Sequence, residues 1–146
     1  MVPINYLAVV GAAVIAIVLG FLWYGPLFGR AWMKSMGMDM DEMKAKAKGD
    51  KKMQMAMMRS YGIMMLSSLV MAFVLAHSLY FASAVLQISG IPAAFQAAVW
   101  NWLGFIAPVS LGGVLWESKT WKWWAITSGY YLVSLFLMGS LLSYWV

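Results

Sequence analysis

The stretch Ile4–Tyr24, INYLAVVGAAVIAIVLGFLWY, contains no charged residue and decides the fold class. An α-helix needs about 20 apolar residues to cross the hydrocarbon core of a bilayer. Three further stretches of this kind follow at Tyr61–Leu86, Ala93–Trp116 and Trp121–Trp145. The chain is 64% hydrophobic and 10% charged, whereas a soluble domain is roughly 45–50% apolar and about 25% charged. The sequence therefore predicts an all-α membrane protein in which four transmembrane helices form one bundle.

These stretches account for most of the chain, so residues 1–146 are expected to form a single four-helix transmembrane domain. The first stretch is expected to be retained as a span, because MVPIN contains no Lys or Arg and WYGPLFGR offers no small-x-small cleavage site. Between the first two spans, residues 25–60 are predicted to be an interfacial and surface helical segment. Gly25-Pro26 is expected to stop the first helix, since proline lacks an amide proton. Asp39 is a suitable N-cap for a short helix after it.

The basic residues predict the orientation in the membrane. They lie between spans one and two (Arg30, Lys34, Lys44, Lys46, Lys48, Lys51, Lys52 and Arg59) and between spans three and four (Lys119 and Lys122). Because Lys and Arg are retained in the cytoplasm, both loops are expected to face inward and both termini outward. The net charge of +5 is then a topology signal and an attraction for anionic lipid at the cytoplasmic face. No nucleic-acid partner is expected, because acidic residues are interspersed among the basic ones.

His77 is the only histidine, and it lies inside the apolar stretch FVLAHSLYF, Phe73–Phe81. Counting along the helices places Asn101 of span three at a similar depth. Unpaired donors are costly in hydrocarbon, so we expect a hydrogen bond between the two side chains. The third member of this intramembrane polar site is expected from span four, as Tyr130, Tyr131 or Ser134. Such a histidine either relays a proton or holds two helices together as a neutral imidazole.

Glu117 follows the third span and is expected to pair with Arg59 or Arg30 at the inner interface. The alternative is that Glu117 serves as an entry site for a cation or a proton. Small residues suggest where helices approach closely. Ala12, Ala16 and Gly20 form a stripe at four-residue spacing on span one, and Gly104 shares a face of span three with Pro108.

No catalytic residue, metal site or cofactor is predicted, and the chain contains no cysteine. The segment between spans one and two is rich in methionine: Met33, Met36, Met38, Met40, Met43, Met53, Met55, Met57 and Met58. Thioether sulfur favours Cu(I), which makes copper binding one interpretation. The simpler interpretation is that flexible methionine side chains fill apolar positions on interfacial helices. The sequence leaves open whether this segment binds copper.

Several motifs together resemble the DUF1761 family of small bacterial four-span membrane proteins. They are NYLAVVGAAVIAIVLGFLWYGPLFGRAWMKSMGM, DEMKAKAKG, VMAFVLAH, WNWLGF, GGVLWESKTWKWWAI and GYYLVSLFLMGSLLSYW. The resemblance implies four spans and a bacterial inner (plasma) membrane, but it supplies no catalytic residue. The residues that match its motif positions are Trp23, Tyr24, Phe28, Gly29, Trp32, His77, Gly104, Glu117 and Tyr130.

Three functions are compatible with these observations, and the first is the one that we expect. It is an oligomeric channel or transporter for a small ion or solute, which predicts that His77 faces a wet cavity, together with Asn101 and Tyr130. A noncatalytic accessory subunit of a larger membrane complex predicts a dry histidine and a large apolar side facing a partner. An enzyme acting on a lipid or quinone predicts a lipid-sized side opening beside His77 or Glu117, and it has the least support because no catalytic cluster is present.

Overall fold

The computed structural model describes residues 3–145, and all regular elements in that range are helical. The elements are α1 (Tyr6–Leu22), the π-helical segment η1 (Trp23–Leu27), α2 (Gly29–Ser35), α3 (Met40–Gly49), α4 (Lys51–Leu86), α5 (Gly90–Asn101), the π-helical segment η2 (Trp102–Ile106), α6 (Ala107–Leu115) and α7 (Trp121–Leu142). Four continuous segments are long and apolar enough to cross a bilayer: Tyr6–Leu27, Lys51–Leu86, Gly90–Leu115 and Trp121–Leu142. The predicted all-α fold with four spans is confirmed.

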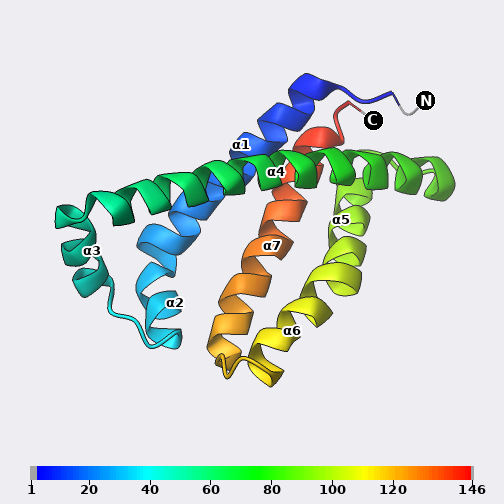
Figure 1. The fold of residues 1–146 in the computed structure, drawn as a ribbon. Coiled ribbons are helices and arrows are strands. Elements are labelled where there is room, and N and C mark those ends of the chain that lie inside the picture. The colour runs from blue at the N-terminus through cyan, green and yellow to red at the C-terminus, as the bar shows by residue number, and fades with distance from the viewer. Residues whose placement is uncertain (1–2, 146) are drawn as a thin grey trace.

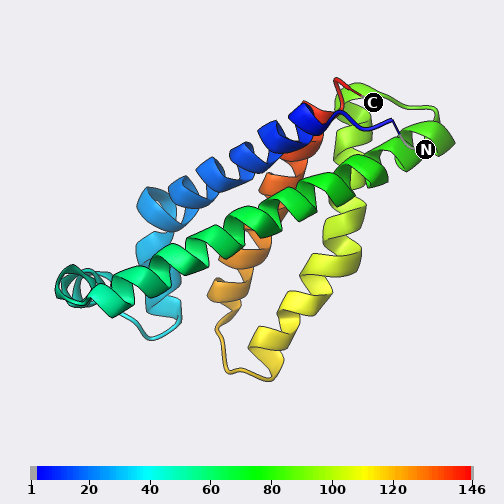
Figure 2. The ribbon, with the colours of Figure 1, turned by 45° about the horizontal axis from the view of Figure 1, so that its top comes forward.

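The two ends of the bundle differ in what they carry (Figure 1). Both termini and the α4–α5 turn lie at one end, while α2, α3 and the α6–α7 loop lie at the other. α4 crosses α7 and the α5–α6 span at a steep angle in both views (Figures 1 and 2). Its 36 residues make a helix about 54 Å long at about 1.5 Å per residue. That length exceeds the roughly 30 Å of hydrocarbon, so α4 both tilts and extends beyond the core with its charged start.

The centre of the bundle is packed with small side chains. Alanines of α1, α4 and α5 are almost completely buried, among them Ala12, Ala16, Ala72, Ala93 and Ala98. They allow α1 and α5 each to pack against both α4 and α7. Larger buried side chains fill the remaining space, namely Leu75, Leu79, Leu135, Met138 and Leu142. The interior is therefore apolar and closely packed.

The first span continues through Gly25-Pro26 instead of stopping there, which corrects our expectation. The chain widens into the π-helical segment η1, and the Phe28 amide donates a hydrogen bond to the Trp23 carbonyl at 2.8 Å, five residues back. This wider turn tolerates the missing amide proton of Pro26. The helix ends only at Phe28, and α2 begins at Gly29. The predicted N-cap of α3 is confirmed, because the Asp39 side chain accepts hydrogen bonds from two amides of its first turn.

Gly104 and Pro108 do not mediate close helix packing, in contrast to the expectation from their spacing. Both are exposed, and a methyl group added at Gly104 would meet nothing within 4 Å. Gly104 lies within η2, which rotates the chain away from regular α-helical register. Pro108 lies in the first turn of α6, where an amide proton is not needed.

Candidate functional site

His77 forms its hydrogen bond within its own helix. Nδ1 lies 2.9 Å from the carbonyl oxygen of Phe73, one turn earlier in α4. A carbonyl only accepts, so Nδ1 carries the proton in this bond. The imidazole also packs edge-on against the Phe73 ring, with 4.5 Å between the ring centroids. The predicted bond to Asn101 is therefore wrong.

Ser78 takes the place that we expected for His77. Its hydroxyl donates a hydrogen bond to Asn101 Oδ1 at 3.5 Å, and Asn101 Nδ2 donates to the Ala97 carbonyl at 2.8 Å. Successive residues of an α-helix are turned by about 100° about the helix axis. Because Ser78 faces α5, its neighbour His77 is directed away from α5. The Ser78–Asn101 pair marks the place where α4 and α5 meet.

Tyr130, Tyr131 and Ser134 do not complete a polar site with Asn101. The buried Tyr130 hydroxyl donates a hydrogen bond to the Ala16 carbonyl of α1 at 2.9 Å. The hydroxyl of Ser134 is directed along α7, 3.5 Å from the sulfur of Met138. Of the five residues of the predicted intramembrane site, Tyr130 and Tyr131 are in contact through their rings, whereas neither His77 nor Asn101 is hydrogen-bonded to any of the other four.

Sequence analysis did not identify the aromatic cluster that surrounds Tyr130. It comprises Trp23, Tyr24, Phe28, Trp32, Tyr130 and Tyr131, whose rings are linked by centroid distances of 4.7–6.3 Å. Its indole groups hold the first span to α7, because Trp23 donates to the Ile126 carbonyl at 3.0 Å and Trp32 donates to Thr127 Oγ1 at 3.2 Å. In residues 3–145 no buried side-chain nitrogen or oxygen lacks a partner. The cluster therefore holds helices together and has no free buried polar group for chemistry.

Glu117 does not form the expected ion pair. Glu117, Arg59 and Arg30 are all exposed, and no salt bridge within 4.0 Å joins them in the described part of the chain. Glu117 lies in the α6–α7 loop and Arg59 lies in the first half of α4. The start of α4 diverges from that loop (Figure 1). The steep crossing of α4 separates the two helix ends. No group of three His, Asp or Glu residues able to hold a metal is found among residues 3–145.

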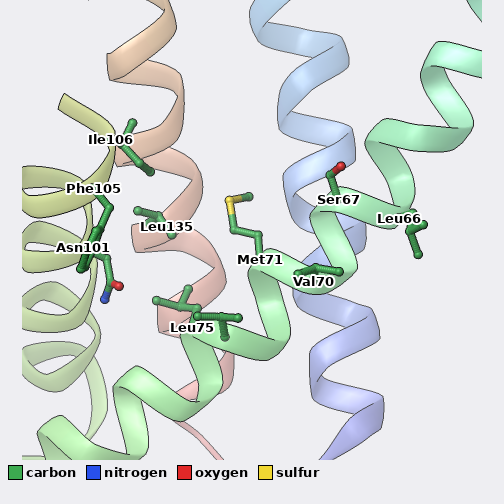
Figure 3. A pocket seen from close by; sticks show the side chains of 10 residues that line it. Leu66, Ser67, Val70, Met71, Leu75, Asn101, Phe105, Ile106 and Leu135 are labelled. Carbon is green, nitrogen blue, oxygen red and sulfur yellow. The ribbon is translucent and has the colours of Figure 1, made fainter. Parts of the chain in front are cut away.

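The structure contains a lateral groove between α4 and the α5–η2 segment (Figure 3). Its volume is about 470 Å³. α4 lines one side with Leu66, Ser67, Val70, Met71, Val74 and Leu75, and the other side consists of Asn101, Phe105, Ile106 and Leu135. The Ser67 hydroxyl is bonded to the Ile63 carbonyl at 3.0 Å, so the groove is almost entirely apolar.

The lateral groove opens sideways from the bundle. Leu66, Val70 and Phe105 on its rim are 64%, 56% and 73% exposed. Asn101 points toward α4 at the closed side of the groove (Figure 3), where its bond to Ser78 joins the two helices. The groove widens because α4 packs against α5 and α7 but diverges from α6 (Figure 2). The groove is therefore an exposed apolar surface on helices that are long and apolar enough to cross a bilayer.

Residues 7–143 of the chain match a family model whose description is "Protein of unknown function (DUF1761)". The chain belongs to the DUF1761 family. No curated protein and no solved structure matches it. Most of the residues at the motif positions of this DUF1761 protein belong to the aromatic cluster, so they have a role in helix packing. Gly29 has one as well, because a Cβ atom there would overlap the Tyr24 carbonyl oxygen.

Proposed function

We propose that this DUF1761 protein is a noncatalytic integral membrane protein that binds a membrane lipid by its acyl chain in the lateral groove. The observation that supports the proposal is the groove itself. It is apolar, it lies between membrane-spanning helices, and it opens sideways. Its volume of about 470 Å³ falls within the roughly 300–1,000 Å³ that is usual for small-molecule sites.

The binding energy would come from packing. An acyl chain that moves from the bilayer into the groove leaves one apolar environment for another, so the hydrophobic effect contributes little. Contacts with branched and aromatic walls such as Val70, Ile106 and Phe105 then determine the affinity, because many weak dispersion contacts add up. The Ser78–Asn101 pair keeps α4 and α5 together at the closed side of the groove.

Photolabelling in vesicles tests the proposal. A phosphatidylcholine that carries a diazirine in one acyl chain is expected to label Leu66, Val70 and Phe105 more strongly than exposed apolar residues elsewhere. Val70→Trp fills the groove and is expected to reduce the labelling of Leu66 and Phe105 several-fold. Val18→Trp is the matched control, because Val18 is 51% exposed on α1 and lies outside the groove. Uniform labelling of all exposed apolar residues, or equal behaviour of the two variants, would contradict the proposal.

The oligomeric channel or transporter and the accessory subunit stay predictions. Leu75, Leu79 and Met138 fill the centre of the bundle, so an ion or solute pathway would have to run between copies of the chain. Crosslinks between two copies through the groove, in place of lipid labelling, would favour these functions. We also propose the bacterial inner membrane as the location, with the α2–α3 end in the cytoplasm.

A further inference from the structure

We infer that the lateral groove selects an anionic phospholipid whose phosphate lies against Arg59 and Lys52 of α4. The inference rests on the proposed function, because it assigns a headgroup to the lipid whose chain occupies the groove. Helix register, charge distribution and membrane symmetry support it independently.

The groove wall continues along α4 into a basic segment. Arg59, Ile63, Leu66 and Val70 follow each other at spacings of four, three and four residues, so they share one face of the helix. Arg59 precedes the groove residue Leu66 by seven residues, which is about 10.5 Å along the axis. Lys52 lies a further seven residues toward the start of α4, on the same face. A lipid with its chain beside Val70 and Leu66 therefore has its headgroup beside these two cations.

All charged side chains of the protein lie at this end of the bundle. Every Lys, Arg, Asp and Glu falls within residues 30–59 or 117–122, and together they carry a net charge of +5. Arg59 and Lys52 are exposed and form no salt bridge within 4.0 Å to any residue of the range 3–145. Asp50, two residues before Lys52, already accepts hydrogen bonds from the amides of Lys52 and Met53 as the N-cap of α4. The headgroup environment is therefore positive, and Arg presents a fork of donors that suits a phosphate.

A second copy of the chain is a poorer occupant than a lipid. Two copies in one membrane share the same orientation, so their basic ends would meet at the same interface. If one copy occupied the groove of the other, their positively charged ends would lie close together and repel each other. A zwitterionic lipid fits the apolar walls equally well but gains little from the cations. An anionic headgroup is the one that complements both features.

Native mass spectrometry of the purified full-length protein tests the inference. Phosphatidylglycerol and phosphatidylcholine with identical acyl chains are titrated in separate experiments, and the affinity ratio is measured. The wild-type protein is expected to bind phosphatidylglycerol more tightly than phosphatidylcholine. In K52Q/R59Q, the affinity ratio of the two lipids is expected to fall about fivefold for each charge removed. The charge-matched control K44Q/K48Q, on exposed positions of α3, is expected to keep the preference. R59K retains the charge and is expected to keep most of the preference, because the attraction to anionic lipid depends mainly on charge.

The outcomes separate failure of the inference from failure of the proposed function. If Val70→Trp weakens both lipids but K52Q/R59Q leaves their ratio unchanged, the groove binds lipid without the proposed headgroup contact and the inference is wrong. If K44Q/K48Q lowers the ratio as much as K52Q/R59Q, the effect is general surface charge and the inference is also wrong. If Val70→Trp changes the binding of neither lipid, the proposed function itself is wrong.

Discussion

Tyr130 joins α7 to α1 by a hydrogen bond from its buried hydroxyl, and it provides the clearest test of a single residue. Tyr130→Phe removes the bond from its buried hydroxyl to the Ala16 carbonyl. Interhelical hydrogen bonds in membranes contribute about 0.6 kcal/mol, and at most about 1.7 kcal/mol, so a loss of that size is expected. The measurement is the free energy of unfolding during SDS titration in mixed micelles. Tyr144→Phe, at a position 75% exposed, is the control and should leave stability unchanged.

His77→Leu is expected to change stability less than Tyr130→Phe does. The imidazole bonds to the carbonyl of its own helix and packs against Phe73, so removing it breaks no hydrogen bond between helices. The same SDS titration measures the effect. A loss equal to that of Tyr130→Phe would show that His77 joins two helices after all.

Hydropathy indicates which polar side chains lie in apolar stretches but does not indicate their partners. Of the two neighbours in FVLAHSLYF, Ser78 contacts Asn101 and His77 does not. The rotation of α4 about its own axis decides whether His77 or Ser78 faces Asn101. That rotation is set by the side chains that α4 buries in the core, namely Ala72, Leu75, Ala76 and Leu79. Serine bonds its own backbone so readily in helices that Ser78 gave no distinct signal.

The two π-helical segments are joined to α7 in the same way. Each begins with a tryptophan whose indole donates a hydrogen bond to a carbonyl of α7, Trp23 to Ile126 and Trp102 to Ser128. The Trp102 indole also lies 3.0 Å from the Ser128 hydroxyl. π-Helical turns are frequent at functional sites, and η2 places Phe105 and Ile106 in the wall of the lateral groove.

Trp102→Phe is expected to destabilise the protein by about 0.6–1.7 kcal/mol and to weaken lipid binding in the groove. The indole bond fixes the start of η2, so its loss frees the wall that carries Phe105. Trp100→Phe is the matched control, because the Trp100 indole donates to Gln96 within its own helix and its side chain is 63% exposed. Unfolding in SDS and photolabelling of Phe105 measure the two effects. Equal results for both variants would show that the bond to α7 does not hold η2.

Hydropathy predicted the first, third and fourth spans to within about three residues at each end, because apolar length alone defines them. It did not predict the π-helical segments, which depend on where Trp23 and Trp102 find acceptors on α7. It also placed the start of the second span at Tyr61, whereas α4 begins at Lys51. The additional turns are formed by good helix-forming residues behind the Asp50 cap. The steep crossing of α4, and with it the groove, is a tertiary property that no local pattern reveals.

For the whole molecule, reporter fusions test the proposed orientation. The structure places both termini at one end of the bundle and α2–α3 at the other (Figure 1). The basic residues all belong to the α2–α3 end and the α6–α7 loop, so alkaline phosphatase fused to either terminus is expected to be active. A reporter in the α3 region is expected to be inactive. An active reporter there, with inactive terminal fusions, would invert the proposed topology.

The most direct measurement is the lipid that the protein retains during delipidation in detergent, counted by native mass spectrometry. The account predicts one lipid per chain that persists after bulk lipid is removed. It predicts loss of this lipid in Val70→Trp and retention in Val18→Trp. Loss of all lipid in parallel from the wild-type protein and both variants would contradict a specific lipid site in the lateral groove.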